Sequence, residues 1–457
     1  MPSLHNVLLI ATYLLNLCDR LILFMAASQI ETQDKPTVNE SRVLYDGAQV
    51  WKVKLRSRED IALIQELVEK EDVSIWKLLP KKAIILVQMD NKPKVRRQLS
   101  SQGLRHTVVE TDVQRRVEEQ KVEPVAWDDK TLRVGKDKTQ LGHRMIWHKY
   151  PTVEVVQEYM NYLTRNYPSL CKQEVIGKSD ENNAIKMLTI SNGNPKNKGI
   201  LLVSGSHARE WIAITSALVI LHVIVSQFDK QPEYVRNKDW HVIPLLNPDG
   251  YRYSYIHDRF WRKNRKNISN THCKGVDINR NFGTDWYVTG VSEDNPCKEL
   301  YGGPHPFSEP ESIALRITVE RLIRRRVVAM VDFHSFGQLI LYPWCARSYP
   351  SRDDRVLNAT AGQMRAAILE YKGRYYTAGR TYDAIYPATG VIIDWVHSSG
   401  IRHSYVIEGR DRGDHGFLMP PAYIMEAGQE MLIAVTRLAR EIDKDFIIVP
   451  RSKLHWF

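Results

Sequence analysis

Several stretches of this chain are apolar along their whole length, and they alternate with segments of helical periodicity. The run 200–203 is aliphatic, leads through Ser204 to Gly205 and Ser206, and opens onto an apolar helical pattern. Strands of this kind are buried on both faces, and helices connect them. We therefore predict an α/β domain with functional residues at strand ends. The predicted strands are 184–190, 199–205, 240–246, 327–334, 338–342 and 403–408, before a last helix over 422–440.

The length and composition indicate a globular protein with more than one domain. The chain has 457 residues, of which 43% are hydrophobic and 26% charged. These fractions are ordinary for folded proteins and exclude a disordered or membrane-spanning class. The formal charge is +11, but the basic residues are scattered. We interpret this charge as aiding solubility or attracting acidic partners, and we expect no nucleic-acid binding.

A separate small domain is expected over 40–120. Its apolar residues alternate in strand segments and recur at helical spacing between them, and Ser57 is suited to cap the first helix. The order is strand, helix, two strands, helix, strand. This order predicts a ferredoxin-like α+β domain.

The two ends and the linker carry processing signals. Residues 1–28 resemble a signal peptide, although Met25 is an alternative start, and a charged pair inside the apolar run argues against a membrane anchor. We expect secretion. Residues 121–141 lack periodicity and contain Arg133, Lys136 and Lys138, so they predict a linker with a processing site, the alternative being a plain surface loop. A second domain over 142–442 and a tail over 443–457 follow.

The five cysteines suggest one disulfide. Cys18 leaves with the predicted signal peptide, and Cys273 and Cys297 bracket a loop-rich segment. We predict that these two pair. Cys171 and Cys345 are then expected to be buried free thiols.

Four residues at strand ends form a candidate metal centre. His207 and Glu210 are three residues apart at the strand-to-helix junction, which places them on one side of the first helical turn. His334 ends another predicted strand, and Glu408 ends a third. Two histidines and one carboxylate, with one position open to water, hold catalytic zinc in many hydrolases. A further carboxylate at a buried strand end is costly unless it is paired or functional.

Seven motifs strengthen this interpretation, in order along the chain. They are HARE at 207–210, NPDGY at 247–251, RFWRKNR at 259–265, DINRNF at 277–282, FHS at 333–335, IYPATGVIIDW at 385–395 and IEGRD at 407–411. Together they resemble the zinc carboxypeptidases of the A/B type over roughly residues 145–440. The preceding domain resembles the activation segment of that family. The resemblance implies a mixed eight-stranded sheet and one Zn²⁺.

The resemblance also implies roles for individual residues. His207, Glu210 and His334 would bind zinc, and Glu408 would act as the general base. Arg262 would stabilise the oxyanion of the tetrahedral intermediate. The substrate's terminal carboxylate would be held by Asn279, Arg280 and Tyr386, with help from Arg209. The disulfide of the family falls at Cys273 and Cys297.

Specificity in this family depends on the residue before Asp394-Trp395, which is Ile393 here. Members that remove Lys or Arg carry an acid at this position, and an apolar residue cannot neutralise a buried cation. We therefore expect an A-type preference for aromatic or aliphatic C-terminal residues, with Val406 lining the same pocket. The sequence departs from the family pattern at Asp332, Phe336, Cys345 and Val391.

The sequence thus predicts a secreted, monomeric zymogen of an A-type metallocarboxypeptidase. Its substrates would be peptide or protein C-termini, and a trypsin-like protease would activate it. Steric cover by the N-terminal domain would keep it inactive. The alternatives are B-type or broader specificity, or a non-catalytic relative that binds peptides or an acidic matrix.

Overall fold

The computed structural model describes residues 41–121, 133–134, 140–141, 143–288 and 295–444. The predicted signal peptide 1–28 and most of the predicted linker 121–141 and tail 443–457 lie outside these residues. The same holds for Lys136 and Lys138. In the linker region the structure describes two short paired strands, β5 (Arg133–Val134) and β6 (Gln140–Leu141).

The small N-terminal domain has the predicted order of elements. They are β1 (Gln49–Lys54), α2 (Arg58–Glu69), β2 (Ser74–Leu79), β3 (Lys82–Val87), α3 (Lys92–Ser101), β4 (His106–Glu110) and α4 (Val113–Glu119). The four strands form an antiparallel sheet in the order β2-β3-β1-β4. Ser57 caps α2, because its side chain accepts a hydrogen bond from the Asp60 amide. The ferredoxin-like prediction is confirmed.

The second domain is built on a mixed sheet of eight strands, in the order β13-β12-β14-β11-β9-β10-β8-β7. The strands are β7 (Cys171–Lys178), β8 (Ala184–Ile190), β9 (Lys198–Ser204), β10 (Lys238–Ile243), β11 (Val327–His334), β12 (Leu339–Tyr342), β13 (Thr377–Arg380) and β14 (His403–Glu408). The central strands β10, β9, β11 and β14 run parallel to one another. Antiparallel strands complete the sheet on either side.

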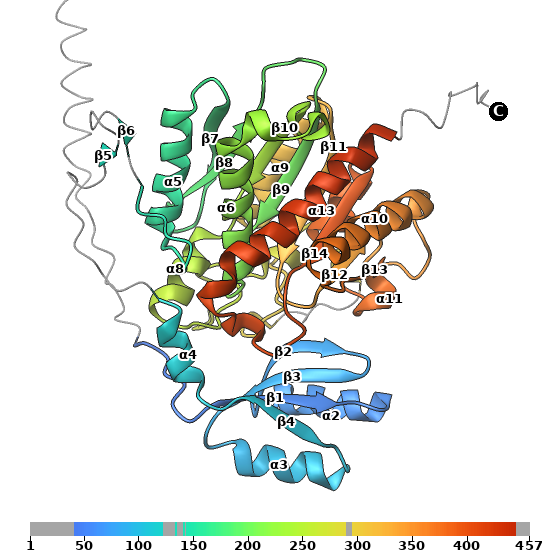
Figure 1. Cartoon of the computed structure of the whole chain (residues 1–457). Helices are drawn as coiled ribbons and strands as arrows, with labels where there is room; N and C mark the ends of the chain where they lie inside the picture. The colour runs from blue at the N-terminus through green and yellow to red at the C-terminus, as the bar shows by residue number, and fades with distance from the viewer. Residues whose placement is uncertain (1–40, 122–132, 135–139, 142, 289–294, 445–457) are drawn as a thin grey trace, which may run out of the picture. The chain divides into compact units, whose positions relative to one another are not determined.

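Helices cover both faces of this sheet. Along β9, Ile200 and Leu202 pack into one core and Leu201 and Val203 into the other, as the alternation of side chains in a strand requires. One face carries α5 (Val153–Asn166), α6 (Trp211–Ser226), α10 (Asp354–Lys372) and α13 (Ile424–Lys444). Figure 1 shows α6 and α13 lying across that face. The other face carries α9 (Pro310–Ile323) and α12 (Ile392–Ser398).

Two strands of the sheet are absent from the sequence prediction, and both lie at its edges. In β7 buried and exposed residues mix, because it is an edge strand with only one neighbouring strand. The strand β13 has four residues, too few to show a period. The last helix begins at Ile424 and extends to Lys444, further than the predicted end.

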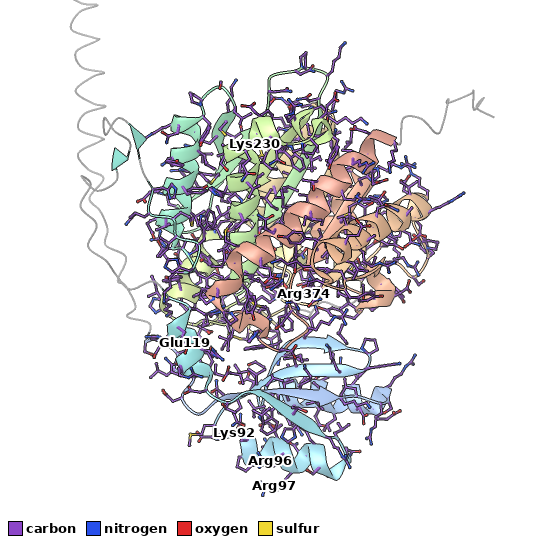
Figure 2. The ribbon with its side chains drawn as sticks, viewed as in Figure 1. Lys92, Arg96, Arg97, Glu119, Lys230 and Arg374 are labelled. Atoms are coloured by element: carbon purple, nitrogen blue, oxygen red, sulfur yellow. A yellow bond between two sulfur atoms is a disulfide. The ribbon has the colours of Figure 1, made fainter. Side chains whose placement is uncertain are left out.

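The exposed basic residues are distributed over different elements. Figure 2 labels Lys92, Arg96 and Arg97 on α3, and also Lys230 and Arg374, which belong to the second domain. The structure therefore agrees with scattered charge. In the described part of the chain, no helix has both the length and the hydropathy that crossing a membrane requires.

Candidate active site

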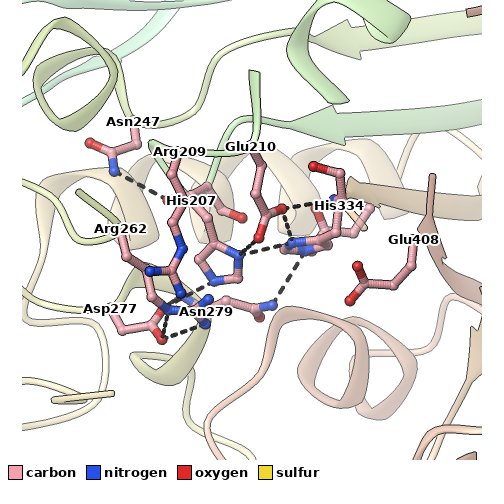
Figure 3. A network of polar contacts seen from close by, with 12 residues as sticks. His207, Arg209, Glu210, Asn247, Arg262, Asp277, Asn279, His334 and Glu408 are labelled. Atoms are coloured by element: carbon pink, nitrogen blue, oxygen red, sulfur yellow. Dashed lines mark hydrogen bonds and ion pairs between the residues drawn. The ribbon is translucent and has the colours of Figure 1, made fainter. Parts of the chain in front are cut away.

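The candidate site lies where three neighbouring parallel strands end. Strand β11 pairs with β9 on one side, where Phe333 is opposite Ser204, and with β14 on the other, where His334 is opposite Glu408. The carboxyl ends of parallel strands meet at one edge of a sheet, where such folds bind ligands. The chain therefore brings His334, Glu408 and the segment after Ser204 together, as Figure 3 shows.

His207 and Glu210 lie in the turn that connects β9 to α6. The prediction placed them in the first helical turn, and that detail is wrong, because α6 begins at Trp211 and Glu210 is its N-cap residue. Gly205 starts the turn with φ +71°, a conformation that L side chains rarely adopt. Asn247 holds the turn from the next loop by donating to the Ser206 carbonyl at 3.1 Å.

The three predicted zinc ligands converge. His207 Nδ1 lies 2.8 Å from Glu210 Oε1, and His334 Nδ1 lies 3.0 Å both from Glu210 Oε2 and from His207 Nδ1. All three side chains are buried. Ligands about 2.1 Å from a tetrahedral zinc stand roughly 3.4 Å apart, close to these spacings. The donor set, two imidazoles and one carboxylate, is also one that zinc prefers, so the residues fit the metal.

A carboxylate lies within hydrogen-bond distance of the other ring nitrogen, Nε2, of each histidine. Asp277 Oδ1 lies 3.2 Å from His207 Nε2, and Asp332 Oδ2 lies 2.8 Å from His334 Nε2. Each carboxylate favours a proton on Nε2, which leaves the Nδ1 lone pair free for a metal.

The electrostatics of the site favour a cation. Burial raises the pKa of Glu210, but His207 and His334 outweigh it and hold that pKa well below the usual range. Burial lowers the pKa of His334, yet Asp332 and Glu210 raise it well above the ordinary value. The carboxylates around the two imidazoles therefore stabilise positive charge at their centre.

Arg262 and Arg280 lie on the far side of His207, around Asp277. Asp277 Oδ2 accepts from Arg262 Nε at 2.9 Å and lies 3.9 Å from Arg280 Nη1. Burial lowers the pKa of Arg262, and Asp277 and Tyr386 are the first of the groups that raise it above its usual range. Arg262 is therefore charged, and Tyr386, which is 39% exposed, lies near it.

Asn279 and Arg209 are anchored by neighbours. Asn279 Oδ1 accepts from the Ile392 amide at 2.8 Å, so the amide group is tied to the start of α12. The guanidinium of Arg209 forms two hydrogen bonds with the Glu299 carboxylate, at 2.9 and 3.1 Å. The structure thus places Asn279 beside His334 and Arg280 beside Asp277, whereas Arg209 is held by Glu299 and the Phe260 carbonyl.

Ile393 lies in a compact apolar cluster. Its members are Leu339, Leu341, Cys345, Ala388, Val391, Ile393 and Val406, none more than 8% exposed. Asp394 adjoins the cluster, but its carboxylate accepts from the backbone amides of Cys345 and Ala346, each at 2.9 Å. Burial raises the pKa of Asp394 to about 6 and that of the Cys345 thiol to about 12.

Comparison with known proteins decides the family. Residues 156–434 match the zinc carboxypeptidase family, and residues 51–120 match the carboxypeptidase activation peptide. The chain belongs to the zinc carboxypeptidase family. It is a zinc-dependent exopeptidase that carries the activation segment of the zymogens.

Relatives of this carboxypeptidase include both specificity types. Zinc carboxypeptidase A 1 of Anopheles gambiae is 31% identical over 87% of this chain and 90% of that protein. Carboxypeptidase B of Astacus astacus is 34% identical over 65% of this chain and 97% of that protein. The crystal structure of thrombin activatable fibrinolysis inhibitor superposes with a TM-score of 0.78, at 26% identity, covering 87% of this chain and 99% of the other.

The disulfide prediction is confirmed. Cys273 and Cys297 are bonded, and Cys171 and Cys345 are buried free thiols. The bond closes a loop over 273–297 within the long segment between α8 (Pro248–Ile256) and α9, and Asp277 lies in this loop.

The structure adds residues that the sequence interpretation did not assign. Asp277 belongs to the motif DINRNF, but no role was assigned to it from the sequence. In the structure it links His207 to Arg262. Glu299 fixes Arg209. Lys77, from the activation segment, places Nζ 3.0 Å from Glu408 Oε1. A lysine within a short strand gives no sequence signal for such a contact.

Proposed function

We propose that this carboxypeptidase is a secreted zymogen with A-type specificity, which removes aromatic or aliphatic C-terminal residues. The observation that carries the specificity is the apolar cluster around Ile393. Both oxygens of the adjacent Asp394 accept hydrogen bonds from backbone amides, so this carboxylate is already satisfied. A lysine or arginine side chain buried there would have no counter-charge, which costs several kcal/mol.

In this proposal His207, Glu210 and His334 hold the zinc. When bound, zinc supplies a Lewis acid that polarises the scissile carbonyl and lowers the pKa of water to near 7. Glu408 takes the proton of the attacking water and delivers it to the leaving amine. Its position opposite His334 at the ends of β11 and β14 supports this role. Arg262 stabilises the negative charge that develops on the carbonyl oxygen, and Asp277 keeps the guanidinium in place.

The free carboxylate of the substrate is bound by Asn279, Arg280 and Tyr386. A guanidinium suits this task because it can donate two parallel hydrogen bonds to a carboxylate. Tyr386 stands on the loop before Gly390, where a Cβ would approach the Arg280 carbonyl oxygen to 2.2 Å. The glycine lets this loop pass directly over Arg280. Arg209 assists further along the cleft.

The domain boundaries in this proposal are those expected from the sequence. A signal peptide over 1–28 directs secretion, and the activation domain over 40–120 covers the site until a protease cuts within 121–141. Contacts between the two domains support the cover. Trp76 packs against Phe260 and Phe417, with ring centroids 4.8 and 5.2 Å apart.

A panel of blocked dipeptides tests the proposed function. The chain is cleaved by limited trypsin treatment, and the release of C-terminal Phe, Leu, Arg and Glu is then compared. The proposal expects release of Phe or Leu after cleavage and much less before it. Preferential release of Arg would contradict the A-type assignment and favour the B-type reading. No release from a folded, zinc-loaded enzyme would contradict the catalytic roles.

A further inference from the structure

Asp332 is a buried carboxylate with a single partner. It stands two residues before His334 on β11, so both side chains lie on the same face of the strand. Its Oδ2 accepts from His334 Nε2 at 2.8 Å, and it is 0% exposed. Within the described residues, no atom bonds to its other oxygen, Oδ1.

Such a carboxylate is costly unless positive charge lies nearby. Asp277, the equivalent partner of His207, has the guanidinium of Arg262 beside it, but Asp332 forms no ion pair with a described lysine or arginine. A divalent metal on the opposite nitrogen of His334 would provide the missing charge through the imidazole.

We infer that Asp332 is a positioning residue for zinc, an addition to the site that the resemblance to the family did not predict. It fixes the proton of His334 on Nε2, aims Nδ1 at the metal and makes the imidazole a stronger donor. This inference rests on His334 being a zinc ligand, as the proposed function has it.

The zinc affinity of two variants tests the inference. Asp332→Asn keeps an acceptor oxygen without the charge, and Asp332→Ala removes both. In competition with a chromophoric chelator, zinc affinity should be highest in the wild type, lower in Asp332→Asn and lowest in Asp332→Ala. The loss of affinity in Asp332→Ala should be about 10–100-fold. Asp249→Asn is the matched control, because Asp249 is equally buried but bonds to Ser179 and Asn183.

Two results would overturn the inference. One is an unchanged zinc affinity in both Asp332 variants, and the other is an equal loss in Asp249→Asn. Failure of the proposed function looks different, since the wild-type chain would then fail to bind zinc at all. If Asp332→Ala does not fold, the zinc affinity of Asp332→Asn still tests the inference. The absorption spectrum of the Co²⁺-loaded protein is a second readout, because it reports the geometry of the metal ligands.

A second, independent observation concerns the activation segment, where a β-bulge turns Lys77 toward the active site. In the β2–β3 ladder Ile75 is opposite Ile85 and Lys77 is opposite Ile84, so Trp76 is the extra residue. Ile85 faces the inner core of the activation domain, whereas Ile84 joins the cluster that contains Phe260, Phe336 and Phe417 of the catalytic domain. Without the bulge, Lys77 would share the inward face of Ile75.

The bulge places the Lys77 ammonium on the catalytic carboxylate. Nζ lies 3.0 Å from Glu408 Oε1, and the two side chains are only 12% and 13% exposed. The adjacent Trp76 is 4% exposed and packs against Phe260 and Phe417 of the catalytic domain. Screening by salt is weak for a pair this buried, so the attraction between the two charges is reduced less than in a surface ion pair.

We propose that Lys77 inhibits the zymogen by pairing with Glu408, in addition to the steric cover that the whole domain provides. The ammonium engages the carboxylate that would accept the proton of water, so even a small substrate that entered the cleft would meet a disabled base. The proposal rests on Glu408 being that base.

Activity before cleavage tests this device. Lys77→Met keeps the aliphatic stem and removes the charge. The control is Lys52→Met, which removes a different ion pair between the domains, Lys52 Nζ to Asp414 Oδ1 at 2.6 Å. On a blocked dipeptide, uncleaved Lys77→Met should be at least about tenfold more active than uncleaved wild type, and Lys52→Met should change less than about twofold. Equal residual activity of both variants and wild type would overturn the proposal.

Trypsin-cleaved samples separate the two possible failures. Suppose that cleaved wild type and both cleaved variants are equally active. If uncleaved Lys77→Met is then no more active than uncleaved wild type, the ion-pair mechanism is refuted and the proposed function stands. If cleaved wild type is inactive, the proposed function fails. In that case the Lys77–Glu408 ion pair is tested by measuring the unfolding equilibrium of the uncleaved chain. A double-mutant cycle with Glu408→Gln should show about tenfold coupling in the unfolding equilibrium constant, and additivity would overturn the contact.

Discussion

Replacing Ile393 by aspartate should convert the substrate preference from aliphatic to basic residues. Ile393 is 2% exposed and shares its cluster with six other apolar side chains. A new carboxylate at this position would be surrounded by apolar side chains, so a lysine or arginine of the substrate becomes its natural partner.

The magnitude follows from the cost of an unpaired buried charge. Leaving one partner of a buried ion pair without its counter-charge costs about 3–5 kcal/mol. Since about 1.4 kcal/mol corresponds to a factor of ten, the new charge should raise kcat/KM for Arg substrates roughly 10²- to 4 × 10³-fold. Loss of apolar contact should lower kcat/KM for Leu by about 10–200-fold.

The assay measures kcat/KM of the trypsin-cleaved enzyme on blocked dipeptides that end in Phe, Leu, Lys or Arg. Ile393→Asn is the control, because it has nearly the same shape as the aspartate variant but no charge. It should lose activity on Leu without gaining activity on Arg. The reasoning is refuted if the Arg-to-Leu ratio is the same in Ile393→Asp and Ile393→Asn, since Ile393 would then lie outside the side-chain pocket.

Three further predictions concern two buried carboxyl groups and the disulfide. Asp277→Asn removes the charged partner of Arg262, whose side chain is only 10% exposed. Zinc affinity should fall about 10–100-fold and kcat/KM at least as much, and unchanged values would contradict the assigned role. Burial raises the pKa of Glu311 to about 8 from a usual value near 4.5, so its contribution to stability is complete below about pH 4.5 and is lost as the pH rises through 8. Urea unfolding should show this loss in the wild type and a flatter profile in Glu311→Gln. Serines at both Cys273 and Cys297 open a loop with a sequence separation of 24, which should lower the unfolding free energy by about 3 kcal/mol, measured as a drop in Tm.

The central architecture could be predicted because burial on both faces leaves a strong sequence pattern. The strand β9 contains the aliphatic run 200–203, and its end leads to His207. Edge strands such as β7 were not predicted, because partial exposure mixes polar and apolar residues in their sequence. Asp332 had a readable signal, since a residue two positions before His334 in a strand must share its face.

The position of Lys77 could not be predicted from the sequence. Strict alternation in the strand puts Lys77 on the same face as Ile75, toward the core of the activation domain. The bulge at Trp76 reverses this assignment. A bulge depends on the pairing with β3 and on the aromatic residues that surround Trp76, and neither is visible in a local pattern.

The most direct test of the account is the release of a C-terminal Phe or Leu by the trypsin-cleaved enzyme, measured before zinc removal, after treatment with a zinc chelator, and after zinc is restored. We expect the chelator to abolish release, zinc to restore it, and Glu408→Gln to bind zinc as tightly as the wild type while releasing almost nothing. Release that survives zinc removal, or that persists in Glu408→Gln, would contradict the assignment of the metal centre and its base.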